Sequence, residues 1–168
     1  MKKSQSVALG GVFAALAVVI MTLGGMIPVA TFITPVLCML LLQFVNILCS
    51  RRIGWAWYGA VAILSLLLSP DKEAAAIFAA MGYYPIVKTF FDKLSVRWLM
   101  KGVYFNAVTL ILYWLLLNVI GMTEIMADFE GIGVWGSALT LLLGNACFFL
   151  VDRALQMTDR LIKKKNRV

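Results

Sequence analysis

Residue types that could perform chemistry are scarce in this chain of 168 residues. It contains no histidine, which excludes a Ser-His dyad, an HExxH zinc site and histidine-based phosphate chemistry. Cys38, Cys49 and Cys147 lie far apart in apolar runs, so they form neither a CxxC redox pair nor a disulfide framework. A Gly-rich phosphate loop followed by lysine and serine is also missing. We therefore expect that the protein is not an enzyme and carries no metal and no cofactor.

The polar side chains that could contact a solute lie inside apolar stretches. One stretch carries Asn106, Thr109 and Tyr113 at helical spacing, with Asn118 near its end. A later stretch has a low-bulk polar stripe, which consists of Gly136, Thr140 and Gly144 with Ser137 and Asn145 beside them. Unpaired polar groups are costly in hydrocarbon, so both sets must face other helices. They form either the wall of a ligand cavity or hydrogen bonds that fix the fold.

A third polar group is Lys88, which follows the segment Gly82-Tyr83-Tyr84-Pro85. Proline removes a helical hydrogen bond and usually kinks the helix. The opened carbonyls, the two phenols and the ammonium could make a site. Lysine near a helix end more often extends its charged head to water. We expect a kinked helix with Lys88 snorkelling to the surface.

Small residues near the N-terminus form two overlapping pairs, Gly10 with Ala14 and Gly11 with Ala15. Such pairs let a second helix approach closely, which is the main attraction available between helices in lipid. Their spacing alone favours packing within the chain over docking of a partner protein.

Membrane helices must position these residues. The chain is 62% hydrophobic and 14% charged, with a mean hydropathy of +0.94, unlike an ordinary soluble domain. A helix needs about 17–25 apolar residues to cross a hydrocarbon core of about 30 Å. Six runs have this character, at residues 5–26, 32–49, 53–69, 74–91, 102–120 and 132–151. We predict an all-α polytopic membrane protein, a six-transmembrane-helix bundle that forms one integral membrane domain over residues 1–168.

The breaks between runs have physical causes. Glycine and proline end the first run, because glycine loosens the backbone and proline lacks an amide hydrogen. Arg51 and Arg52 separate the second run from the third. We expect a basic connector over residues 92–101 and an acidic, Gly-rich connector over residues 122–131. The second connector, with Trp135 just after it, either folds over a cavity or is a solvated loop.

Positive charge predicts the orientation. Of the 15 Lys and Arg residues, 14 fall on one side of the predicted bundle, and only Lys72 falls on the other. By the positive-inside rule, the N- and C-termini are cytoplasmic, and residues 152–168 form a basic cytoplasmic tail. Asp152 and Asp159 belong to this cytoplasmic end. The net charge of +7 thus reflects membrane topology and some attraction to anionic lipid, and we expect no nucleic-acid partner.

The whole arrangement resembles the substrate-binding S component of energy-coupling factor transporters. The likeness rests on six helices in a short chain, on the opening SVALGGVFAALAVV and on the GGMIP break before the second helix. In that family a membrane subunit captures a vitamin, a vitamin precursor or a metal ion from outside. It then docks on a membrane coupling protein that is driven by two ATPase subunits.

The resemblance also implies roles for particular residues. Family members dock through an Ala-xxx-Ala pattern on the first helix, and the matching positions here are Gly10, Gly11, Ala14 and Ala15. This reverses the preference from spacing and favours docking. Family ligands bind in the outer half, which corresponds to Asn118, Thr140, Trp135, Thr22 and Glu124. The nickel and cobalt members use an N-terminal histidine that this chain lacks.

We therefore expect a multi-pass subunit of a bacterial inner membrane that captures a small organic solute of the vitamin or precursor class. The alternative is a structural or assembly membrane protein that acts through its basic cytoplasmic tail, residues 163–167. A channel or carrier that works alone is disfavoured, because no intramembrane acid and no internal repeat is visible in the sequence.

Overall fold

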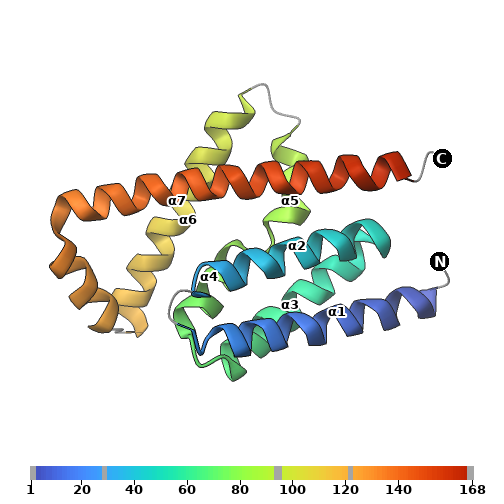
Figure 1. The fold of residues 1–168 in the computed structure, drawn as a ribbon, viewed down its shortest axis with the longest axis horizontal. Helices are drawn as coiled ribbons and strands as arrows, with labels where there is room; N and C mark the ends of the chain where they lie inside the picture. The colour runs from blue at the N-terminus through green and yellow to red at the C-terminus, as the bar shows by residue number, and fades with distance from the viewer. Residues whose placement is uncertain (1–2, 28–29, 93–95, 121–122, 166–168) are drawn as a thin grey trace. The chain divides into compact units, whose positions relative to one another are not determined.

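The structure, a computed structural model, is helical throughout its described elements, which confirms the all-α prediction. It describes the backbone of residues 3–27, 30–92, 96–120 and 123–165, and the side chains of residues 4–27, 30–92, 96–118, 138–139 and 141–160. The elements are α1 (Lys3–Gly24), α2 (Ile33–Leu48), α3 (Arg51–Leu68), α4 (Lys72–Met81), α5 (Tyr84–Phe91), α6 (Arg97–Leu115), the π-helical segment η2 (Leu116–Ile120) and α7 (Thr123–Lys165) (Figure 1).

These helices form two compact units. Unit 1 consists of residues 1–92 and 155–168, so it contains α1 to α5 and the end of α7. Unit 2 consists of residues 93–154, with α6, η2 and the remainder of α7. The prediction of one membrane domain over residues 1–168 stays a prediction.

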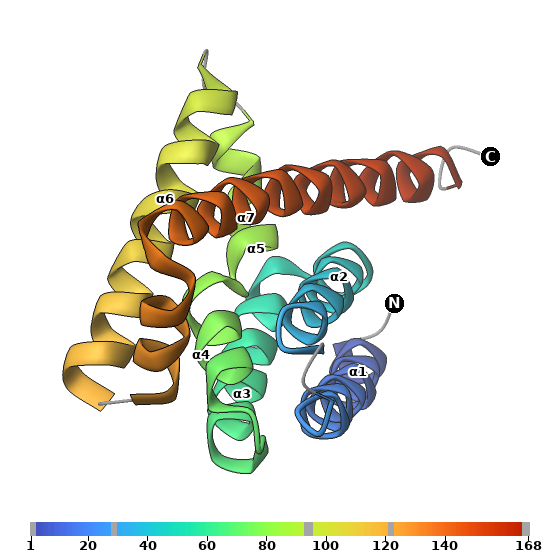
Figure 2. The same ribbon diagram turned by 60° about the vertical axis from the view of Figure 1, so that its left-hand side comes forward.

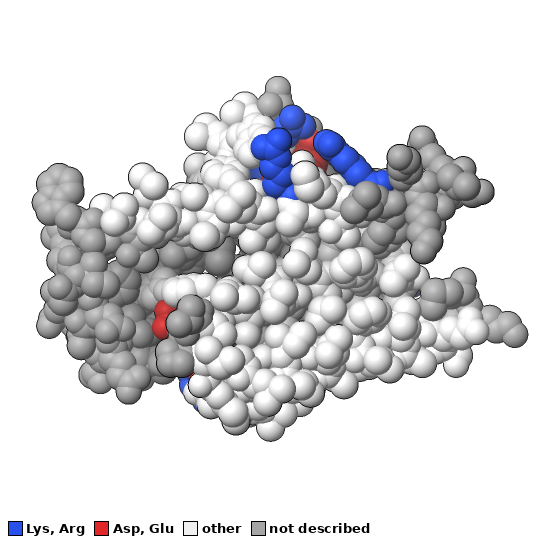
Figure 3. Space-filling view, in the orientation of Figure 1, with Lys and Arg blue, Asp and Glu red and all other residues white. Residues whose placement is uncertain are grey.

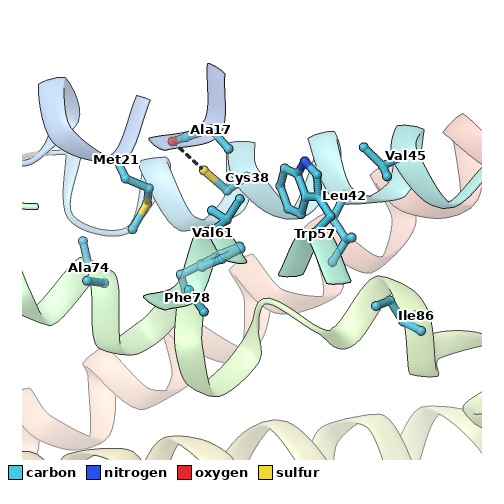
Figure 4. Close-up of a cluster of buried hydrophobic side chains, with 12 residues drawn as sticks. Ala17, Met21, Cys38, Leu42, Val45, Trp57, Val61, Ala74, Phe78 and Ile86 are labelled. Carbon is cyan, nitrogen blue, oxygen red and sulfur yellow. Dashed lines mark hydrogen bonds between the residues drawn. The ribbon is translucent and has the colours of Figure 1, made fainter. Parts of the chain in front are cut away.

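The core of unit 1 is a cluster of buried apolar side chains to which all of its first five helices contribute (Figure 4). Phe78 of α4 lies against Trp57 of α3, with ring centroids 6.4 Å apart. On the other side of the cluster, the Cys38 thiol of α2 donates to the Ala17 carbonyl of α1 over 3.6 Å. The remaining members drawn with labels are Met21, Leu42, Val45, Val61, Ala74 and Ile86.

Close backbone approach joins α1 to its neighbours at one end of unit 1. A Cβ atom built on Gly24 would lie 2.0 Å from Cγ2 of Thr34, so only glycine fits there. The Thr34 hydroxyl donates to the Ala30 carbonyl, which fixes that methyl in place. The Ser69 hydroxyl donates to the Met21 carbonyl over 3.2 Å and ties the end of α3 to α1.

The kink predicted at Pro85 is an interruption between two separate helices. α4 ends at Met81, α5 begins at Tyr84, and Pro85 lies in the first turn of α5, where its missing donor costs little. The break leaves the last carbonyls of α4 without helical partners. The Tyr58 hydroxyl of α3 donates to one of them, on Ala79.

Three described helices are long and apolar enough to cross a membrane: Ser4–Gly24, Lys72–Phe91 and Arg97–Asn118. α2 is a shorter apolar helix of 16 residues. The membrane character is thus supported, whereas six crossings and cytoplasmic termini stay predictions. Large apolar side chains remain exposed on the described helices, for example Val12 at 67% and Leu67 at 71%.

Two predicted connectors are wrong. α6 begins at Arg97, so the second half of the basic connector is helical. α7 runs from Thr123 to Lys165, so the acidic connector and most of the basic tail are helical as well. Figure 2 shows α7 beside α6 in unit 2, with a bend in its orange part. The glycines suggested a loop there, but glycine also allows a helix to bend without ending it.

Replacing Gly24 by alanine should destabilise the protein, because the new methyl group would overlap Thr34. We expect a loss of about 1–3 kcal/mol, as for other overpacked sites. The control is Gly59→Ala in α3, where nothing lies within 4 Å of a Cβ atom. That change should be neutral or stabilising by up to about 1 kcal/mol. Unfolding of both variants in detergent measures the difference, and equal midpoints would contradict the close approach.

Candidate functional site

The small residues of α1 divide between two faces. Gly10 is buried, and a Cβ atom there would lie 3.3 Å from Cγ2 of Ile53 in α3. Ala14, one turn later, packs against the core cluster. Gly11 and Ala15 are exposed, and nothing lies within 4 Å of a Cβ atom built on Gly11. Gly10 and Ala14 therefore pack against other parts of the chain. Gly11 and Ala15 lie on the outside of α1, where they leave the helix surface without bulky side chains.

The surroundings of the exposed pair are apolar. Val12 and Val19 of α1 are 67% and 50% exposed. In the space-filling view, the described surface over α1 and α2 is white, without charged side chains (Figure 3). A helix face of small and apolar residues suits contact with lipid or with another membrane helix.

Two of the predicted solute-binding residues can be placed by their side chains. The Thr22 hydroxyl in α1 donates to the Val18 carbonyl over 2.8 Å. The exposed Asn118 amide donates to the Trp114 carbonyl over 2.9 Å. The first bond lies within α1, and the second joins η2 to the last turn of α6. Thr22 belongs to unit 1 and Asn118 to unit 2, and their contact with a solute stays a prediction.

The other three predicted solute-binding residues lie outside the described side chains. Glu124, Trp135 and Thr140 are all in the backbone of α7. For Glu124 this replaces the expected connector by a helix, whereas Trp135 lies within the helical run expected at residues 132–151. Their contact with a solute stays a prediction.

A charged cluster in unit 1 connects α2, α5 and the end of α7. The Lys88 ammonium lies 3.2 Å from a carboxylate oxygen of Asp159, and the amide of Gln43 donates to the other oxygen. The Lys88 side chain is 2% exposed, and that of Asp159 is 29% exposed. The prediction that Lys88 snorkels to water is therefore wrong. Its charge is neutralised inside the protein, because a carboxylate 71 residues later in the chain reaches it.

A second buried ion pair lies in unit 2. The Lys101 ammonium contacts both carboxylate oxygens of Asp152, at 2.8 and 3.0 Å, and both side chains are at most 2% exposed. The sequence analysis placed Lys101 at the end of a connector, which is wrong because Lys101 lies in α6. It placed Asp152 at the cytoplasmic end of the chain and did not predict that the two residues pair. Each charge lies in a helix and is desolvated by its neighbours, so the pair is needed to keep either charge buried.

Further contacts continue from this pair along α6 and α7. Phe105 and Phe148 stack with centroids 4.8 Å apart. The amides of Asn106 and Asn145 bond reciprocally, at 2.9 and 3.0 Å. Since residue numbers rise along α6 as they fall along α7, the two helices run antiparallel. For Asn106 and Asn145 the structure therefore favours hydrogen bonds between helices that fix the fold over the wall of a ligand cavity.

Gly144 supports the same interpretation, because a Cβ atom there would lie 3.4 Å from the Phe105 ring. The rest of the stripe, at Gly136, Ser137 and Thr140, lies outside the described side chains. Among residues whose side chains are described, no group of three or more Asp, Glu or Cys could hold a metal ion.

The ion pairs were missed because each partner looks ordinary in its own segment. Lys88 and Lys101 stand near the ends of apolar runs, where lysine commonly reaches water. Asp152 and Asp159 lie two helical turns apart among basic residues. One signal could have suggested the pairing: two lysines and two aspartates border apolar runs, so their charges balance in number.

No protein-family model, curated protein or solved structure matches this chain.

The Lys101–Asp152 pair can be tested by a double-mutant cycle. Lys101→Met leaves a buried carboxylate without its partner, and we expect a loss of about 3–5 kcal/mol in the free energy of unfolding. Lys101→Met combined with Asp152→Leu removes both charges and should recover most of that loss. Chemical denaturation in detergent measures all variants. Equal losses in the single and the double variant would contradict a coupled pair.

The burial of Lys88 predicts its reactivity. A water-soluble amine reagent should modify the exposed Lys72 in the folded protein and leave Lys88 unmodified, because the Lys88 side chain is 2% exposed. Peptide mass spectrometry after a short exposure reads both positions. Denatured protein supplies the control, since both lysines should then react alike. Equal rates in the folded protein would restore the snorkelling interpretation.

Proposed function

We propose that this chain is the substrate-capture S component of an energy-coupling factor importer in a bacterial inner membrane. It binds a small organic solute of the vitamin or precursor class from the outer side. It then docks on a membrane coupling protein with two ATPase subunits, which supply the energy. The proposal includes six membrane crossings and cytoplasmic termini, as the distribution of lysine and arginine predicts.

The exposure of Gly11 and Ala15 on α1 is the observation that carries this proposal. A docking helix needs small residues on its free face, so that a partner helix can come close. Packing within the chain is already provided by Gly10 and Ala14 on the inner face. The outer pair is therefore available to a partner, and it occupies one of the two registers that the resemblance implies.

The solute-binding part of the proposal rests on Asn118, Thr140, Trp135, Thr22 and Glu124. Asn118 lies in η2, where a π-helical segment interrupts the regular helix after α6. Such segments occur frequently at functional sites, because they reposition side chains and loosen backbone hydrogen bonds. Apolar walls with a few polar groups suit a small organic solute.

Two substitutions one residue apart test the docking. Gly11→Leu adds bulk to the exposed face, so it should abolish association with the coupling protein and ATPases and leave the fold intact. Gly10→Leu adds the same bulk against Ile53 and should lower the unfolding midpoint. Affinity purification of each tagged variant from its native membrane, followed by mass spectrometry, identifies the ATPases. Thermal unfolding in detergent separates the two effects.

Several outcomes would contradict the proposal. Wild-type protein that co-purifies with no ATPase complex and no small molecule would refute it. Retention of the ATPases by Gly11→Leu would refute docking through this face of α1. Removal of residues 163–168 distinguishes the alternative, since a scaffold that acts through its basic tail would lose its partner on truncation and keep it in Gly11→Leu.

A further inference from the structure

An open groove of about 550 Å³ runs along α6 in unit 2. Its lining is almost wholly apolar, and the Asn106 amide within it is already bonded to Asn145. Gly102 has no side chain, so it widens the groove at its position in the lining. The residues that line the groove are Trp98, Leu99, Gly102, Val103, Asn106, Ala107, Leu110 and Phe149.

The groove faces the outside of a helix that is long and apolar enough to cross a membrane. Val103 and Leu110 in its lining are 56% and 60% exposed. From Trp98 to Leu110 the helix rises about 18 Å at 1.5 Å per residue. One leaflet of the hydrocarbon core is about 15 Å thick, half of about 30 Å. The groove is thus about as long as one lipid acyl chain in its leaflet.

One end of the groove is basic. Arg97 precedes Trp98, and Arg153 lies one turn beyond Phe149 on α7, whose ring contacts Trp98 with centroids 5.5 Å apart. Both arginines are exposed. The neighbouring Lys101 and Asp152 neutralise each other, so the charge at this end comes from the arginines. Arginine with tryptophan is the combination expected at the level of lipid headgroups.

We propose that the α6 groove binds an anionic phospholipid, with one acyl chain along the groove and its phosphate at Arg97 and Arg153. The charge of the arginines selects an anionic headgroup, and the apolar lining with the gap at Gly102 accepts the chain. The groove lining contains no residue of α1 and none of the predicted solute-binding residues. It requires only that α6 lies in a membrane.

Native mass spectrometry of the full chain, released from nanodiscs with equal amounts of phosphatidylglycerol and phosphatidylcholine, tests the headgroup. The wild type should retain more phosphatidylglycerol than phosphatidylcholine. Arg97→Gln with Arg153→Gln should lower the retained phosphatidylglycerol by about tenfold, because each basic residue near the surface attracts anionic lipid. Arg51→Gln with Arg52→Gln removes the same charge from exposed positions on α3 and should retain the lipid.

A second pair of variants tests the groove. Val103→Trp fills it and should lower retention of both lipids, whereas Ile111→Trp, at an exposed position of α6 outside the lining, should not. Equal retention in these two variants would overturn the proposal, as would equal losses in the two double-arginine variants or no preference in the wild type. If Val103→Trp does not fold, the comparison of the two double-arginine variants still tests the proposal. All four arginines are exposed, so their replacement should leave the fold intact. If another protein segment occupied the groove, no variant would lose bound lipid, and this result would also overturn the proposal.

Discussion

The cost of placing a charge in an apolar interior governs this structure. A lysine or aspartate among membrane helices must find an opposite charge, because hydrocarbon offers no solvation. Lys101 does so with Asp152 inside unit 2, and Lys88 does so with Asp159 inside unit 1. These pairs join α5 to the end of α7 in unit 1 and α6 to α7 in unit 2. Apolar contacts are less specific than these ion pairs, because one apolar side chain can pack against many others.

Small residues complement the ion pairs. At Gly10 against Ile53 and at Gly24 against Thr34, glycine removes the side chain that would hold the two segments apart. In lipid this matters more than in water, because apolar burial alone does not draw helices together. The many exposed apolar side chains on the described helices are consistent with surroundings of hydrocarbon.

Much of the helical architecture could be predicted from the sequence, because apolar runs and their breaks are local features. The second helix, expected at residues 32–49, and the interruption expected as a kink at Pro85 agree with the structure within a few residues. The long α7 and the pairing of Lys88 could not be predicted in this way. Both depend on contacts between segments far apart in the chain, and a snorkelling lysine has the same local sequence as a paired one. The solute-binding residues came from the family resemblance and stay predictions.

The distance in sequence between Lys88 and Asp159 affects how the protein is made. At about 5–20 residues per second, the ribosome needs about 4–14 seconds to add the 71 residues between them. During that interval Lys88 lacks the carboxylate that neutralises it in the folded chain. A chain cut short before Asp159 would never resolve this state.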